Sequence, residues 1–89
     1  MKVQNMTSNR SGREVANQFI IYGDNGDVVF QSYRTVIAKI SQGKTYLDKK
    51  SWDCSVTTGK YRNQFLCENR KETERKIKDG TYELVDLNN

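Results

Sequence analysis

The chain has 89 residues, of which 35% are hydrophobic and 29% are charged, and its net charge is +4 at pH 7. A single domain of this length buries a small core, which argues against a deep, enclosed active-site cavity. The sequence has no histidine, which excludes Ser-His and Cys-His nucleophile pairs, and it has no apolar run long enough to cross a bilayer.

Residues 1–16 are predicted to form an irregular N-terminal arm, and residues 17–89 are predicted to form one α+β domain. The arm is rich in Ser, Asn and Gly, which favour turns over periodic structure. It lacks the hydrophobic region of a secretory signal, so we expect a cytoplasmic protein that does not bind membranes.

Four strands are expected in the first half of the domain. Aromatic and β-branched residues fill 19–22 and 28–33, and the Asn25-Gly26 pair between them is a strong hairpin signal because both positions must tolerate positive φ. Residues 34–40 continue as a strand with alternating apolar side chains, and a turn then leads to a short edge strand at 45–47.

A first helix is predicted to begin between Thr57 and Thr58, because Ser and Thr side chains cap helix N-termini well. Its apolar face is expected to cover the sheet. That face contains Tyr61, Phe65 and Leu66.

A second helix is predicted from Asn69 to Asp79. Asn69 and Glu72 have the spacing of a capping box, and Gly80 is a residue that commonly ends a helix. The apolar run within residues 81–87 then predicts a last strand.

The predicted fold class is therefore α+β. It combines an antiparallel sheet of three to four N-terminal strands, two short helices, and a C-terminal strand that rejoins the sheet. The predicted packing sets Tyr61, Phe65, Leu66 and Ile77 of the helices against Val36, Ala38 and Ile40 of the sheet.

The positive excess of the chain lies in residues 34–62, which contain seven basic and two acidic residues. Aromatic residues are interleaved with these basic residues, a combination that single-stranded nucleic-acid binders use. The same segment also suits an acidic protein surface, and surface lysines that keep a small domain soluble give the alternative explanation.

We expect no metal, no cofactor and no enzymatic activity. Each of the two cysteines, Cys54 and Cys67, lies beside an acidic residue rather than in an electropositive setting, so both are expected to be free, inert thiols. Asp24 and Asp27 flank the hairpin turn, where Asp is ordinary turn chemistry.

Arg62 falls on the apolar face of the first helix, where a cation needs a partner. One interpretation is a structural ion pair with Asp53 or Asp86. The alternative is a ligand contact, since a guanidinium fits phosphate or carboxylate and the hydroxyl-rich helix start would add an anion-binding corner. The candidate binding residues are Arg34, Lys49, Lys50, Ser55, Thr57, Thr58, Lys60 and Arg62.

Three segments, SGREVANQF at 11–19, WDCSVTTGKYRNQFL at 52–66 and ETERKIKDGTYELVDLN at 72–88, resemble a family of small uncharacterised proteins of bacteriophages and mobile elements of gut-type bacteria. The resemblance covers most of the chain from Ser11. It implies a protein that acts by stoichiometric binding, and it supplies no catalytic residues.

Three functional hypotheses follow. The first is a non-enzymatic inhibitor of the anti-defence or anti-CRISPR type that binds a host protein or nucleoprotein complex in the host cytoplasm. The second is direct nucleic-acid binding through residues 34–62. The third is a nucleotide or small-anion binder that uses Arg62 and the helix start.

Overall fold

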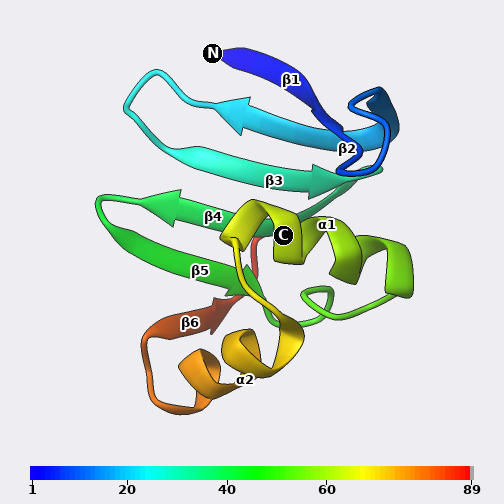
Figure 1. Ribbon diagram of the computed structural model, residues 1–89. Coiled ribbons are helices and arrows are strands. Elements are labelled where there is room, and N and C mark those ends of the chain that lie inside the picture. Colours follow the sequence, from blue (N-terminus) through cyan, green and yellow to red (C-terminus); the bar gives the residue numbers. More distant parts are fainter. Residues whose placement is uncertain (89) are drawn as a thin grey trace.

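The computed structural model describes residues 1–88 as a six-stranded sheet with two helices packed against one face (Figure 1). The strands are β1 (Lys2–Thr7), β2 (Glu14–Tyr22), β3 (Val28–Ser32), β4 (Thr35–Ser41), β5 (Lys44–Asp48) and β6 (Tyr82–Val85), and the helices are α1 (Val56–Leu66) and α2 (Arg70–Lys78). The α+β prediction is confirmed.

The sheet follows chain order, β1-β2-β3-β4-β5-β6. Neighbouring strands are antiparallel except β5 and β6, which are parallel. The sheet is therefore mixed and has more N-terminal strands than the three to four predicted. The C-terminal strand does rejoin it, but α1 and α2 return the chain to the start of β5, so β6 runs in the same direction as β5.

The prediction of an irregular arm over residues 1–16 is wrong. Strand β1 pairs with β2, which begins at Glu14, and the predicted turn residues form only the connection between them. In that turn Gly12 has φ +71° and donates its N–H to the carbonyl of Ser8. Strand β1 is mostly polar and buries only Met6, so its order comes from pairing with β2, which local sequence does not reveal.

Two turns also differ from the sequence prediction. The β2–β3 connection spans residues 23–27, with Gly26 at φ +91°, and is longer than a two-residue hairpin turn. The tight turn is instead Tyr33-Arg34, where Ser32 pairs directly with Thr35. Tyr33 has φ +57°, which a bulky residue adopts rarely, so this turn has no Gly or Asn signature in the sequence.

A β-bulge in β4 changes which of its residues are buried. Phe30 of β3 pairs with Ala38 and Gln31 pairs with Val36, so Ile37 is an extra residue and is fully buried beside Ala38. Strict alternation predicted Val36, Ala38 and Ile40 on the core face. Of these only Ala38 is in the buried core, because the bulge breaks the period of two.

The C-terminal segment secures this bulge. The side chain of Asn88 donates to the carbonyl oxygen of Val36 at 2.8 Å and accepts from its N–H at 2.6 Å. Asn88 therefore takes the place of a strand neighbour for one residue of β4.

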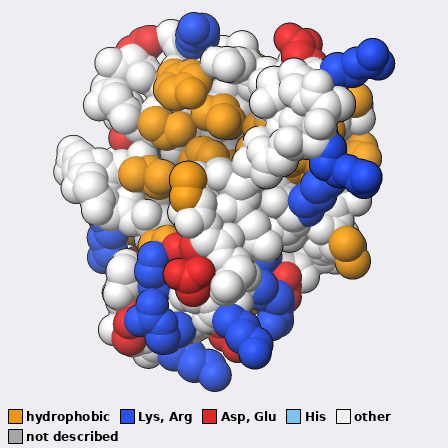
Figure 2. All heavy atoms as spheres, viewed as in Figure 1, with side chains coloured by type: hydrophobic (Ala, Val, Ile, Leu, Met, Phe, Trp, Pro, Cys, Tyr) orange, Lys and Arg blue, Asp and Glu red, His pale blue; other side chains and the backbone are white. Residues whose placement is uncertain are grey.

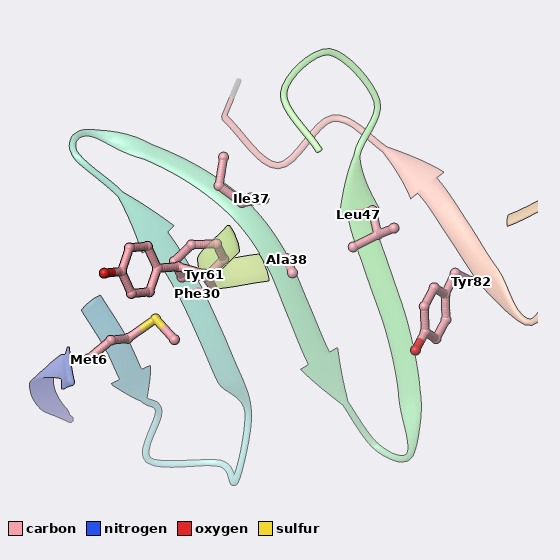
Figure 3. Packing of buried hydrophobic residues seen from close by; sticks show 7 residues of the cluster. All are labelled: Met6, Phe30, Ile37, Ala38, Leu47, Tyr61 and Tyr82. Atoms are coloured by element: carbon pink, nitrogen blue, oxygen red, sulfur yellow. The ribbon is translucent and has the colours of Figure 1, made fainter. Parts of the chain in front are cut away.

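The buried core centres on Phe30, whose ring stacks on Phe65 at a centroid distance of 5.7 Å. Figure 3 shows Met6 and Tyr61 beside Phe30, and Leu47 and Tyr82 farther along the sheet. The buried residues of this cluster are Met6, Phe30, Ile37, Ala38, Leu47, Tyr61 and Tyr82. The predicted helical residues Phe65, Leu66 and Ile77 pack against it and are partly buried.

Both helices have polar caps. Ser55 is the N-cap of α1 and accepts the N–H of Thr58, so α1 begins about two residues earlier than predicted. The capping box predicted for α2 is confirmed, with Asn69 accepting from Glu72 and Glu72 accepting from Asn69.

The side chain of Glu68 joins the two helices to β6. Although it is 3% exposed, it accepts from Thr73 at 2.6 Å, from Lys76 at 2.7 Å and from Tyr82 at 2.8 Å. Burial alone would raise the pKa of Glu68, but these hydrogen bonds outweigh it and lower the pKa below its usual value. Glu68 therefore stays ionised and holds α2 against β6.

Candidate functional site

An open hollow of about 1070 Å³ runs along the solvent side of α1, and we call it the α1 hollow. Three outward positions of the helix, Lys60, Asn63 and Gln64, lie on its lining, because residues three and four apart share a helix face. Its full lining is Asn9, Asp53, Ser55, Val56, Gly59, Lys60, Arg62, Asn63, Gln64, Cys67 and Arg70.

Arg62 forms the floor of the α1 hollow. Its side chain is 1% exposed and reaches back over the first turn of α1, where its Nη atoms lie 3.7 Å from the position that a Cβ of Gly59 would occupy. The guanidinium therefore packs over the backbone of Gly59, where an added Cβ would be at an ordinary contact distance.

The guanidinium of Arg62 is held by three hydrogen bonds. Its Nη1 donates to the carbonyl of Trp52 at 2.7 Å and to Oδ1 of Asp53 at 3.0 Å, and its Nη2 donates to Asn63 at 2.9 Å. The predicted ion pair with Asp53 is thus confirmed. The Nε atom is buried and has no partner among the described residues.

Asp53 is shared by two arginines. Its Oδ2 accepts from Nε of Arg70 at 2.7 Å, while Arg62 holds its Oδ1. Burial would raise the pKa of Asp53, but hydrogen bonds from Arg70 and Arg62 outweigh it and lower the pKa below its usual value. Among the described residues, Asp53 is the only carboxylate on the lining of the α1 hollow, and both its oxygens are engaged.

Trp52 lies between the same two arginines. The guanidinium carbon of Arg62 lies 5.2 Å from the centroid of the Trp52 ring, and the guanidinium carbon of Arg70 lies 5.8 Å from the same centroid. The indole therefore joins the 49–55 loop to both helices. The candidate binding residues predicted from the sequence do not include Arg70, which lies seventeen residues after Asp53 and completes this cluster.

The structure separates the eight candidate binding residues. Ser55, Lys60 and Arg62 line the α1 hollow. Arg34 and Lys50 instead line a second hollow of about 470 Å³ at the end of β5, which also contains Asp48 and Asp86.

The remaining three candidates line neither of these hollows. Thr58 is buried against the sheet, with its hydroxyl 3.2 Å from that of Ser32. Lys49 and Thr57 are exposed. The candidate binding residues come from one basic segment of the sequence, but the fold does not bring them together at either hollow.

The remaining chemistry is modest. Cys54 and Cys67 are free, as predicted, and both are exposed. Within residues 1–88 no group of three or more His, Cys, Asp or Glu side chains is arranged to hold a metal ion. Neither α1 nor α2 has the length and apolar character that a bilayer span requires.

A protein-family model matches most of the chain. No curated protein and no solved structure matches the chain. The matching family model covers residues 1–80, and thus both helices, the α1 hollow and five of the six strands. The chain belongs to this family, a family of unknown function (DUF8033).

Proposed function

We propose that the protein is a non-enzymatic binding protein, encoded by a bacteriophage or a mobile element. In this proposal it acts in the host cytoplasm by stoichiometric binding to a host macromolecule, as an anti-defence or anti-CRISPR-type inhibitor. The origin rests on the resemblance of residues 11–19, 52–66 and 72–88 to proteins of such elements.

The observation that carries the binding role is the α1 hollow. It is open to solvent, and seven of its eleven lining residues are cationic or carry a side-chain N–H or O–H donor. The chain has no histidine to serve as a general base near neutral pH. A surface of this kind suits recognition of a large partner. A domain this small has little buried volume for an enclosed site, so we expect it to bind through its outer surface.

Affinity capture tests this proposal. The full chain, carrying a C-terminal tag, is expressed in a bacterial host, and the captured macromolecules are quantified relative to the bait. We expect one partner near equimolar amount, which a tag-only bait does not retain. Capture of no macromolecule above the tag-only background would contradict the proposal.

Nucleic-acid binding is a second candidate because of the second hollow. Tyr33 is 59% exposed on the tight β3–β4 turn, beside Arg34, and the fold brings Arg34 together with Lys50. An exposed ring beside Arg34, which shares a hollow with Lys50, suits base stacking along a phosphate backbone. Asp48 and Asp86 line the same hollow and balance its two cations, which places this candidate second.

Salt dependence tests the second candidate. Affinity for a single-stranded oligonucleotide is measured between about 50 and 200 mM salt, where each phosphate contact contributes a log–log slope of roughly −0.7. We expect Tyr33→Ala to lower affinity with little change in slope, and Arg34→Gln to reduce the slope. Absence of binding at low salt would remove this candidate.

A further inference from the structure

The α1 hollow has a distinct balance of charge. Lys60, Arg62 and Arg70 are cationic, and the carboxylate of Asp53 is already shared between two of them. Helix α1 has no acidic residue in its first turn. A ligand that enters the hollow therefore meets an excess of positive charge and no free carboxylate among its lining residues.

The uncharged lining residues are suited to a peptide. The amide side chains of Asn63 and Gln64 lie between Val56 at the start of α1, which is 91% exposed, and the exposed Cys67 at its C-cap. The Nε2 of Gln64 already donates to the carbonyl of Thr7, which fixes this side chain over the end of β1. Helix α1 rises about 16 Å over its eleven residues, a length that about five residues of an extended peptide span.

The aromatic rings around the hollow are not available for base stacking. Tyr61 is buried, and the ammonium of Lys60 lies 5.4 Å from its centroid. Trp52 has Arg62 and Arg70 against its ring. Single-stranded nucleic-acid sites depend on free aromatic faces, so the α1 hollow favours a protein partner over a nucleic acid.

We propose that the α1 hollow is the docking surface for an extended acidic segment of a partner protein. Carboxylates of the segment bind Lys60 and Arg70, and Asn63 and Ser55 lie at its edges. Arg62 acts as a positioning residue, because it is buried and orients Asp53, which together with Glu74 holds Arg70 in place. This inference rests on the proposed function and names its class of partner.

The single tryptophan of the chain provides the assay, because Trp52 contacts Arg70. The full chain is titrated with a capped hexaglutamate peptide, with capped hexaglutamine, and with a deoxythymidine hexanucleotide, at about 100 mM salt. We expect hexaglutamate to change the fluorescence of Trp52 with saturation and to bind more tightly than either of the other probes. Equal binding of hexaglutamine, or tighter binding of the oligonucleotide, would overturn the inference.

A matched pair of variants separates the hollow from general charge attraction. Lys60→Gln removes one charge from the hollow and is expected to weaken hexaglutamate binding roughly two- to five-fold. Lys71→Gln removes the same charge from α2, outside the lining of the α1 hollow, and is expected to have no such effect. A loss as large in Lys71→Gln as in Lys60→Gln would overturn the inference.

The two proposals fail in different ways. If Lys60→Gln bait captures the host partner as well as the wild-type bait does, the docking inference is wrong and the binding function stands. If the wild-type bait captures no partner, the function fails, and the peptide titration still decides whether the hollow recognises acidic segments. Thermal unfolding of Lys60→Gln at the wild-type temperature confirms that its fold is intact.

Discussion

Around Phe30 the sheet and α1 are joined by apolar side chains, whereas the 49–55 loop and α2 are attached by buried charge. The first region contains Phe30, Ile37 and Ala38, each with no exposed surface. In the second, Arg62 and Glu68 each have at least two polar partners. Figure 2 shows the same division on the surface, with apolar side chains gathered over the upper strands and charged side chains around α2.

The two regions are expected to respond differently to mutation. Apolar burial is non-directional, so a substitution in the core costs stability in proportion to the side-chain volume that it removes. A buried charge depends on each partner, because loss of one leaves the other uncompensated. The sheet is therefore expected to lose stability with lost volume, and the helical region with lost charge.

Removal of the central ring has the largest expected effect. Phe30→Ala deletes a fully buried ring that stacks on Phe65, and it should lower the free energy of unfolding by about 3–5 kcal/mol. Urea denaturation measures the change. Val36→Ala, at a half-buried site on the same sheet, is the control and should lower the free energy of unfolding much less. An equal loss in the two variants would show that the volume buried at Phe30 does not determine stability.

Neutralisation of Asp53 tests the charged region. Asp53→Asn keeps the shape of the side chain but leaves the buried cation of Arg62 without its counter-charge, so we expect a loss of about 3 kcal/mol. The control is Asp79→Asn at an exposed ion pair, which should cost about 1 kcal/mol or less. If both variants unfold at the same urea concentration, the Arg62–Asp53 contact does not stabilise the fold.

Neutralisation of Glu68 is expected to cost less stability than neutralisation of Asp53 and to change how stability depends on pH. Glu68→Gln removes a charge that accepts from Lys76, and should cost about 1.5–2 kcal/mol at pH 7. Because the pKa of Glu68 is lowered by folding, its contribution is complete above the usual value of 4.5 and is lost as the pH falls through the folded-state pKa.

Denaturation curves from pH 7 down to about pH 3 measure this pH dependence. Wild type should lose stability more steeply than Glu68→Gln in this range. Glu83→Gln, at the exposed pair with Lys44, should follow wild type. Parallel curves for wild type and Glu68→Gln would mean that the carboxylate of Glu68 does not contribute through its ionised form.

Gly59→Ala should have the smallest effect and the opposite sign. An added Cβ would lie 3.7 Å from both Nη atoms of Arg62, an ordinary contact distance, and Ala is a better helix former than Gly. We expect a gain of about 0.5–1 kcal/mol, measured as a higher melting temperature. Gly26→Ala is the contrast, because Gly26 has φ +91° and should lose stability. A loss in Gly59→Ala would show that Arg62 needs the space beside Gly59.

Features set by neighbouring residues were predicted from the sequence. The capping box of Asn69 and Glu72 depends on two side chains three residues apart, and α2 begins and ends close to the predicted positions. The second half of β2, residues 19–22, and β3 follow from their aromatic and β-branched residues. The interpretation of Arg62 as an ion-pair partner of Asp53 followed from a cation placed on an apolar helix face.

Features that depend on distant partners were decided by the tertiary structure alone. Strand β1 forms because β2 lies beside it, and Ile37 is buried because Phe30 and Asn88 fix a bulge in β4. The candidate site divides for the same reason: the chain turns at Tyr33 and again after β5, so Arg34 and Lys50 meet at the end of the sheet while Lys60 joins Arg70 along α1. Composition determines the positive charge of residues 34–62, but strand register and helix packing determine which of those charges share a surface.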